Sequence, residues 1–382
     1  MKKISGLLCA LAAFLCLFSG CVRQTPAVSE PTQTVTRPSE PPETTAPPET
    51  VLTYPDPTVT QPAGESFLLS FAGDCTFGDN FDSETDYGTF CKVVKENYAY
   101  PLANVRDIFQ NDDYSFVNLE CALTESDPTE EEMEELKENL FRFRGPMAYT
   151  QILVEGGVEF ASCANNHSKD YGLQGLYDTW KALDEAELDY ASFGKSCVVT
   201  TDRGLTIGVF AVFFNTTQAA VENQVIYLRN QGAELIVMSV HWGDEGSYSP
   251  NEKQQSMGHM AIDAGVDIVY GHHSHTLQRI EPYNGGIIYY SLGNFSFGGN
   301  RNPKDSDTAI IQQEVLRYED GTVVLGDLKV IPCSVSSAQT WNNYQPTPYA
   351  ADDIACSRIY DKLQGSYEGD DVYVPYLEEE EK

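Results

Sequence analysis

"VDIVYGHHSH", residues 266–275, places three histidines within four positions at the end of a nearly continuous apolar run. Val266 to Tyr270 form that run, and its composition predicts a buried β-strand. The whole chain contains only six histidines, so half of them directly follow this one strand. Imidazoles gathered in a loop after a buried strand are typical of a catalytic or metal-binding site.

The same pattern, an apolar strand that runs into a polar loop, recurs along the chain. It is found at 66–74, 113–120, 158–167, 205–215 and 233–243. Predicted helices alternate with these strands, at 101–110, 148–157, 172–186, 217–232 and 251–265. The alternation predicts an α/β core with helices on both faces. The acidic stretch 126–140 predicts an inserted, solvated helix.

The later part of the chain has a different pattern. Residues 278–295 and 308–333 predict β-hairpins around residues 284–286 and 320–321. We therefore expect one folded domain over 65–333, in which antiparallel strands extend the α/β core. Residues 340–382 have no clear pattern, and residues 334–382 are expected to form a peripheral C-terminal tail.

Composition limits the classes of partner. The 382 residues include 24 basic and 57 acidic side chains, which gives a formal net charge of −33. Nucleic-acid-binding proteins normally present a basic face, so nucleic acid is not expected as a partner. A polyanionic partner would also be repelled unless cations lie between the two.

The N-terminus predicts export and anchoring. Basic residues precede an apolar stretch that is short for a transmembrane helix and typical of a secretory signal peptide. The sequence LFSGC, which ends at Cys21, resembles a bacterial lipobox; a signal peptide cut elsewhere is the alternative. Residues 22–64 are rich in Pro, Thr and Glu and predict a disordered spacer. We therefore expect a lipoprotein signal peptide over 1–21, lipid on Cys21, and a location on the extracytoplasmic face of the cell membrane.

The polar loops after the strands should lie close together, because the carboxyl ends of parallel strands share one edge of a sheet. Carboxylate oxygen and imidazole nitrogen together are suitable ligands for Mn, Fe or Zn. A bridging carboxylate and a His-x-His loop can hold two ions about 3.5–4 Å apart. The candidate residues are Asp74, Glu120, Asn166, His167, His241, His273 and His275.

Each candidate taken alone also has a structural explanation. A Gly-Asp pair after a strand is often a turn, Asn166 can cap the next helix, and His241 can be a satisfied core residue. His259 lies on a predicted helix without a partner, so we assign it no site role. His273 and His275 are stronger candidates, because alternation places them on one side if the strand continues. The combination favours a metal site, since five of the six histidines lie in these loops.

A family resemblance supports this interpretation. The series GD, NLE, ANNHSKDYG, HWGDE, GHHSHTLQ and SLGNF, in this order over about residues 66–300, closely resembles the CapA family of capsule and poly-γ-glutamate synthesis proteins. That family is related to calcineurin-like metallophosphoesterases. The resemblance implies an α/β fold, a metallophosphatase-like four-layer α/β/β/α sandwich.

The resemblance also implies metal ligands. Asp74 resembles the first carboxylate ligand, and Glu120 stands where the metallophosphoesterases have a bridging aspartate. Asn166 and His241 resemble ligands of the second metal. The wider superfamily has a histidine ligand two residues after the first aspartate, and Thr76 occupies that position here. One of the two ions would then have fewer protein ligands, so a single-metal site is an alternative.

The last motif and the ANNH motif complete the implied set. His273 and His275 match the final histidine pair, and His272 is a neighbour without an assigned role. His167 matches the histidine that protonates a leaving group or stabilises a transition-state oxygen, and Asp170 could orient it.

We therefore expect a lipid-anchored, CapA-like metal-dependent hydrolase or transferase in capsule or poly-γ-glutamate biosynthesis, export or attachment. The expected cofactor is one or two divalent ions, Mn, Fe or Zn. The expected partners are an anionic extracellular polymer, the membrane and polymer synthase subunits. The alternative is a non-catalytic, tethered subunit of a membrane polymer synthase. A solute-binding lipoprotein would share the signal and spacer but would not need the imidazole cluster.

Overall fold

The computed structural model describes residues 51–52, 64–80, 89–136, 141–338 and 341–369. The predicted signal peptide, Cys21 and nearly all of the predicted spacer lie outside these residues and stay predictions. Within the described ranges, no helix combines the length and the apolar character that a membrane crossing requires.

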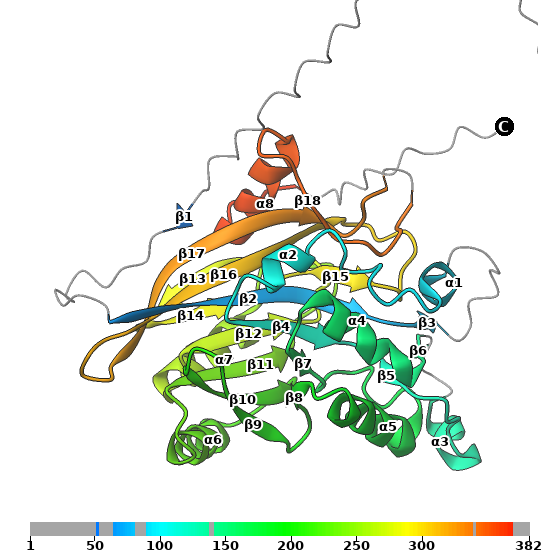
Figure 1. The fold of residues 1–382 in the computed structure, drawn as a ribbon, viewed down its shortest axis with the longest axis horizontal. Helices are drawn as coiled ribbons and strands as arrows, with labels where there is room; N and C mark the ends of the chain where they lie inside the picture. Colours follow the sequence, from blue (N-terminus) through cyan, green and yellow to red (C-terminus); the bar gives the residue numbers. More distant parts are fainter. Residues whose placement is uncertain (1–50, 53–63, 81–88, 137–140, 339–340, 370–382) are drawn as a thin grey trace, which may run out of the picture. The chain divides into compact units, whose positions relative to one another are not determined.

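Two large sheets form the centre of the fold (Figure 1). The first has nine strands, in the order β1-β17-β16-β2-β4-β7-β8, with β15 paired to β2 and β18 to β17. Its parallel strands are β2 (Glu65–Thr76), β4 (Tyr114–Leu119), β7 (Phe160–Ser162), β8 (Asp189–Ala191) and β15 (Asn294–Phe297). Its antiparallel strands are β1 (Val51–Leu52), β16 (Asp307–Arg317), β17 (Val323–Ser334) and β18 (Thr347–Pro348).

The second sheet has six strands, in the order β13-β14-β12-β11-β10-β9. Its parallel strands are β10 (Thr206–Phe213), β11 (Leu235–His241), β12 (Ile268–His272) and β14 (Gly286–Tyr289). The antiparallel edge strands are β9 (Ser196–Thr200) and β13 (Ile280–Tyr283). Both predicted hairpins are confirmed, as β13–β14 and β16–β17. A small third sheet contains β3 (Asp79–Asn80), β5 (Ala122–Leu123) and β6 (Phe143–Gly145).

Helices cover the outer faces of both large sheets. The second sheet carries α6 (Gln218–Asn230) and α7 (Glu252–Asp263), whose first turns are capped by Thr217 and Asn251. The first carries α1 (Phe90–Val94), α2 (Arg106–Phe109), a 3₁₀ helix (Met147–Tyr149), α4 (Thr150–Gly156) and α5 (Gly172–Glu185). The helix predicted over 101–110 is shorter than expected, because turns occupy its first half.

Three apolar clusters separate the layers. Alternation along β2 directs Phe67, Leu69 and Phe71 into the cluster between the two sheets. There the ring of Phe71 stacks on Phe116 at 4.5 Å and meets Tyr270 of the second sheet at 5.2 Å. The other two clusters lie between each sheet and its helices. The predicted four-layer α/β/β/α sandwich is confirmed, and the fold is metallophosphatase-like.

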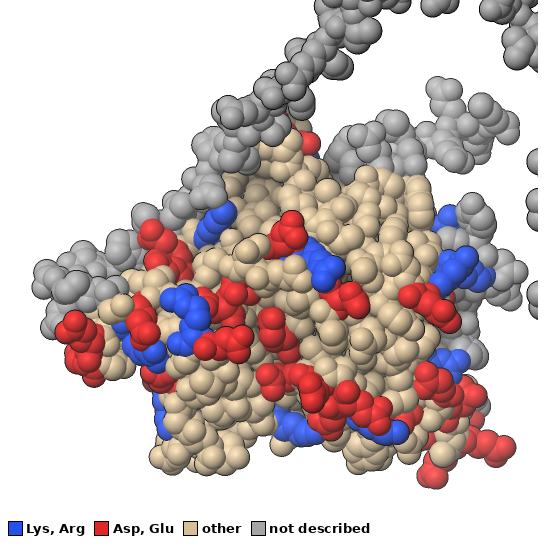
Figure 2. Space-filling model, in the orientation of Figure 1, with Lys and Arg blue, Asp and Glu red and all other residues tan. Residues whose placement is uncertain are grey.

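The predicted acidic insertion contains α3 (Glu130–Glu135), which begins with a capping box between Thr129 and Glu132. Figure 2 shows acidic side chains over much of one face, with a group of them over α3 and basic side chains between them. The strongly acidic composition is therefore visible as surface charge.

The C-terminal region differs from the expected peripheral tail over 334–382. Its helix α8 (Ile354–Gln364) packs against β16 and β17 (Figure 1). Ile359 and Leu363 are buried in the cluster between the sheets. The i, i+4 spacing of these two residues is the signal that sequence reasoning missed. This part of the chain belongs to the folded domain.

Candidate metal centre

The predicted site residues lie at the carboxyl ends of strands from both large sheets. Asp74 lies near the end of β2, and Glu120 directly follows β4. His241 ends β11, and His272 ends β12. Within each pair the two strands are parallel neighbours, so their ends share one edge of a sheet.

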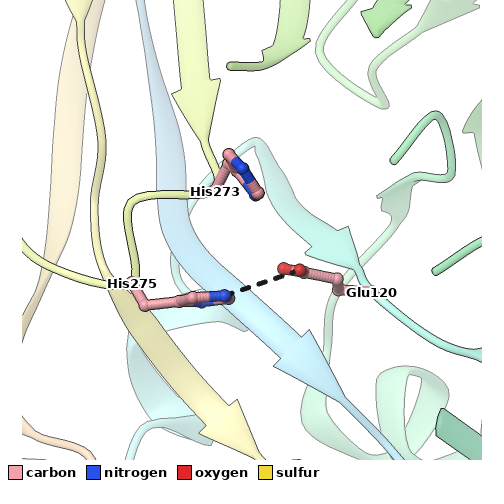
Figure 3. A group of neighbouring side chains, drawn as sticks. All are labelled: Glu120, His273 and His275. Atoms are coloured by element: carbon pink, nitrogen blue, oxygen red, sulfur yellow. Dashed lines mark ion pairs between the residues drawn. The ribbon is translucent and has the colours of Figure 1, made fainter. Parts of the chain in front are cut away.

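Glu120 is common to both groups of candidate ligands. Its Oε1 lies 3.5 Å from Nε2 of His241 and 3.8 Å from Nε2 of His275. Ligand atoms of Glu120, His273 and His275 lie within 4.8 Å of one another, and so do those of Asp74, Glu120 and His241. Figure 3 shows the Glu120 carboxylate facing the two imidazoles of the first group. A carboxylate shared by both groups has the position expected of a bridging ligand.

Asp74 lies against two of the imidazoles. Its Oδ2 is 3.5 Å from Nδ1 of His275, and its Oδ1 is 3.3 Å from Nδ1 of His272. Nδ2 of Asn118 donates to the same Oδ1 at 2.9 Å. The structure therefore brings together Asp74, Glu120, His241, His273 and His275, with His272 beside them.

Several ligand atoms of this group are buried without a hydrogen bond to any described residue. They are Oε1 of Glu120, both ring nitrogens of His241, Nδ1 of His273 and Nδ1 of the neighbouring His272. Oδ1 of Asn166, on the loop after β7, is also buried without such a bond. Each buried polar atom without a partner destabilises a fold by about 1–3 kcal/mol. A divalent cation would satisfy several of them at once, so the donor set fits a metal of the Mn, Fe or Zn class.

The electrostatics of the imidazoles favour ligation. Burial, together with repulsion from His273, holds the pKa of His241 well below its ordinary value. Burial and the nearby His275 lower the pKa of His273. Both rings are therefore neutral and offer a lone pair. At His275 burial lowers the pKa, but the Glu120 and Asp74 carboxylates outweigh it and raise the pKa to about 9.

The two carboxylates differ. Burial alone would raise the pKa of Asp74, but the imidazoles of His272 and His275 outweigh burial and hold this pKa well below its ordinary value. Burial and repulsion from Asp74 raise the pKa of Glu120 well above its ordinary value. A bound cation would offset the repulsion between them.

His167 and Asp170 form a second, adjoining unit. Nδ1 of His167 lies 2.7 Å from Oδ2 of Asp170, and that oxygen also accepts a hydrogen bond from the Phe143 backbone N–H at 2.7 Å. Nε2 of His167 is directed to Glu120, 3.9 Å from its Oε1. Asp170 thus orients the ring, as the sequence comparison implied.

Three asparagines that sequence reasoning did not assign hold the site residues in place. Asn118 donates to Asp74, and Asn165 donates to the Leu119 carbonyl at 2.8 Å. Oδ1 of Asn294 lies 2.9 Å from Nδ1 of His275. All three asparagines lie within the motifs NLE, ANNH and SLGNF, which were the available signal.

The remaining candidates are placed as follows. Asn166 lies on the loop between β7 and α5 and does not cap α5, whose N-cap is Tyr171 without a side-chain bond. The Thr76 hydroxyl donates to the Glu120 carbonyl at 3.0 Å. His259 was expected to lack a partner, but its Nε2 lies 3.1 Å from Oε1 of Glu281. Both residues lie outside the centre.

A pocket of about 340 Å³ opens beside the centre. His167 and His275 form part of its wall, and Phe143 and Phe297 give it an apolar side. Glu245 and Lys304 lie on its lining and are both exposed. The pocket can therefore admit a ligand with apolar and charged parts to the imidazole side of the centre.

Comparisons with known proteins agree with the geometry. Residues 68–299 match the model of a family described as "Bacterial capsule synthesis protein PGA_cap". The chain is 28% identical to the "Capsule biosynthesis protein CapA" of Bacillus anthracis over 78% of this chain and 73% of that protein. It is 28% identical to the "PGA biosynthesis protein CapA" of Bacillus subtilis over 77% of each.

A more distant relative is a "Probable polyglutamine synthesis accessory protein" of Mycobacterium tuberculosis, 24% identical over 63% of this chain and 71% of that protein. The family match runs from β2 to β15, which includes the parallel strands of both large sheets and every residue of the candidate centre. The chain therefore belongs to the CapA family of bacterial capsule synthesis proteins, which is related to capsule and poly-γ-glutamate biosynthesis.

Proposed function

We propose that this protein is a lipid-anchored, extracytoplasmic hydrolase or transferase that depends on a divalent metal and acts on an anionic capsule polymer such as poly-γ-glutamate. The observation that carries the proposal is the set of buried, unsatisfied ligand atoms around Glu120. A structural site would normally satisfy such atoms within the protein. These atoms instead lie beside a pocket and an oriented histidine.

The chain's own residues supply proton transfer and orientation. A divalent ion held by Asp74, Glu120, His241, His273 and His275 would supply Lewis-acid chemistry. Asp170 fixes the His167 ring through Nδ1, so Nε2 of the protonated ring can donate a proton to the leaving atom, which is an oxygen in a phosphodiester and the nitrogen in a γ-glutamyl amide. His167 also lies on the pocket wall, where a substrate would meet it.

An anionic polymer is compatible with an acidic protein if local positive charge offsets the overall repulsion. The bound ion would provide such charge, and Lys304 on the pocket lining would provide more. A γ-glutamyl unit has a carboxylate, an amide and a short methylene segment. The pocket offers an ammonium group, amide side chains and phenylalanine rings to these three parts, respectively.

The test compares the full chain with His167→Ala on phosphodiester and γ-glutamyl substrates, with and without Mn²⁺. We expect metal-dependent turnover in the wild type, and a loss of about 100-fold or more in the variant with bound metal retained. His259→Ala, which removes a histidine outside the centre, is the matched control and should keep full activity. Turnover that His167→Ala leaves unchanged would contradict the assigned role.

The second candidate function is a non-catalytic subunit of a polymer synthase. The description of the mycobacterial relative as an accessory protein favours it. Thr76 also favours it, because it stands at a position where related enzymes have a metal ligand. In the same assay, tightly bound metal without turnover on any substrate would support this second function.

Anchoring has its own test. The full chain expressed in a bacterium should sediment with membranes, be released by detergent and incorporate labelled fatty acid. Cys21→Ser should abolish the labelling. Labelling that persists in this variant would show that Cys21 is not the attachment residue.

A further inference from the structure

His272 is the one histidine of the GHHSH motif to which the family resemblance gives no role. It ends β12, is only 1% exposed, and lies between Ser239 of β11 and Asp74 of β2. Its Nε2 is 3.2 Å from the Ser239 hydroxyl oxygen, and its Nδ1 is 3.3 Å from Oδ1 of Asp74. The ring therefore joins the second sheet to the first at the metal centre.

The hydrogen bonds around Ser239 determine which ring nitrogen carries the proton. Ser239 donates its single hydroxyl hydrogen to the oxygen of Ser162 at 2.6 Å. Its oxygen can then only accept from His272. Nε2 of His272 is thus the donor, and in the neutral ring Nδ1 carries a lone pair.

This lone pair lies next to a second electron-rich atom. Nδ1 makes no hydrogen bond to any residue that the structure describes. Its neighbour, Oδ1 of Asp74, already accepts from Asn118 at 2.9 Å. With Nε2 as the only protonated nitrogen, these two atoms repel each other in a buried site unless a cation lies between them; in the ligand-free protein a second proton, on Nδ1, would serve the same purpose. Ligand atoms about 2.0–2.1 Å from one tetrahedral ion are about 3.3 Å apart, which matches the observed separation.

We propose that Nδ1 of His272 is a metal ligand, bound to the same ion as Asp74. This ligand would compensate for the histidine that Thr76 replaces. The Thr76 hydroxyl is bound to the Glu120 carbonyl and is not available as a ligand. The imidazole ligand would then come from His272 at the end of β12 in the second sheet, instead of from the position of Thr76 in β2 of the first sheet. The inference rests on the proposed metal dependence but not on catalysis.

Two substitutions distinguish the contribution of Nδ1 of His272 from that of Nε2. In His272→Gln the amide reaches the Nε2 position and keeps a donor for Ser239, but nothing replaces Nδ1. In His272→Asn the side-chain oxygen lies near the Nδ1 position and can still bind a metal. His259→Gln is the control, because that imidazole lies outside the centre. Zn²⁺ affinity is measured on the full chain by competition with a chelator, and folding is checked by circular dichroism.

We expect His272→Gln to weaken Zn²⁺ binding by about 10–100-fold or more, His272→Asn to weaken it less, and His259→Gln to leave it unchanged. X-ray absorption of the Zn-loaded protein should show fewer imidazoles per zinc in His272→Gln. Unchanged affinity, or lower affinity with an unchanged imidazole count, would overturn the inference. A wild type that binds no metal would instead overturn the proposed function.

A measurement on the wild type makes the inference independent of variant folding. In protein with ¹⁵N-labelled histidine and bound ¹¹³Cd²⁺, Nδ1 of His272 should show scalar coupling to cadmium and Nε2 should keep its proton. A ring with protons on both nitrogens in the metal-loaded protein would overturn the proposal.

Discussion

Two regions of the molecule bury charged side chains, and they differ in whether those charges are satisfied. At the C-terminal helix, Nζ of Lys362, 1% exposed, lies 2.8 Å from Asp305 and 2.7 Å from Asp307. Arg358 adds two bonds of 2.6 Å to Asp307. At the metal centre, by contrast, buried Glu120 has an oxygen without a hydrogen bond to any described residue.

The difference distinguishes a structural charge cluster from a candidate binding site. Around Lys362 each ion has partners within the fold, so the cluster can fix the position of α8 without a ligand. Around Glu120 two carboxylates and several imidazoles lie close together, an arrangement that suits the proposed metal ion. Such preorganisation favours ligand binding at the expense of stability in the ligand-free protein. The two regions should therefore respond in opposite ways when a charge is removed.

The largest effect is expected at Lys362. Lys362→Met leaves Asp305 without its cation in a buried site and should lower the free energy of unfolding by about 3–5 kcal/mol. Metal affinity of the folded protein should not change. Urea denaturation in the presence and absence of metal measures both quantities.

Lys181→Met is the matched control for that substitution. Its ammonium group lies 3.7 Å from Glu185, but both side chains are 64% exposed. We expect a change of at most about 0.5 kcal/mol. A similar loss for both lysines would show that burial of the Lys362 cluster does not matter.

Substitution of Glu120 should change the free energy of unfolding less than Lys362→Met does. Without metal the change should have the opposite sign, so that the variant is stabilised. Glu120→Gln removes the carboxylate that both ligand groups share and should weaken metal binding on the order of 100-fold. Without metal, the variant should be more stable than the wild type by about 1–3 kcal/mol, because it removes a buried carboxyl group that burial and the Asp74 carboxylate both disfavour in its ionised form. Thermal unfolding with and without a chelator tests both signs. Lower stability of the variant in chelator would contradict the comparison.

Metal affinity should fall less at Asn294 than at Glu120, because Asn294 contacts the proposed ligand His275 but is not itself proposed as a ligand. Its Oδ1 holds Nδ1 of His275 and so directs Nε2 toward Glu120. Asn294→Ala should weaken metal binding by about 10-fold. Asn294→Asp keeps an acceptor and should weaken it less. Equal losses in both variants, measured by chelator competition, would exclude this orienting role.

The centre was predictable because its residues follow strands that the sequence marks clearly. Asp74, Glu120 and His241 each come at the end of an apolar run, and parallel strands bring such ends together. The order of motifs then implied which histidines would join them. The same reasoning gave the two hairpins, because their turns contain glycine at the required places.

The C-terminal cluster was not predictable in this way. Lys362 and Arg358 resemble a solvated helix face in the sequence, because such residues are rarely buried. Their partners lie 57 and 51 positions earlier in the chain, and no local pattern records that pairing. The roles of Asn294 and His272 likewise depend on contacts between separate strands.

Two partly buried acids at the amino ends of β4 and β7, Asp112 and Glu159, should give the smallest effect on the free energy of unfolding. The Ser115 backbone N–H donates to Glu159 at 2.8 Å, and its hydroxyl donates to Asp112 at 2.9 Å. Burial raises the pKa of each carboxyl to about 7, from ordinary values of 3.8 for Asp112 and 4.5 for Glu159. Between about pH 4 and pH 7 the folded protein therefore holds protons that the unfolded chain has lost.

It follows that the free energy of unfolding falls as the pH rises through this window. The double substitution Asp112→Asn and Glu159→Gln should reduce that fall by about 1 kcal/mol, a figure reduced for the partial exposure of both groups. Urea denaturation at pH 5 and pH 8, in chelator, measures the difference. Because the metal centre is the same in both proteins, its own titration cancels in the comparison. Glu185→Gln, an exposed acid, should behave as the wild type. If the double variant and the wild type lose equal stability between the two pH values, these acids are ionised in the folded protein at pH 5, and their hydrogen bonds to Ser115 are then enough to stabilise the partly buried charges.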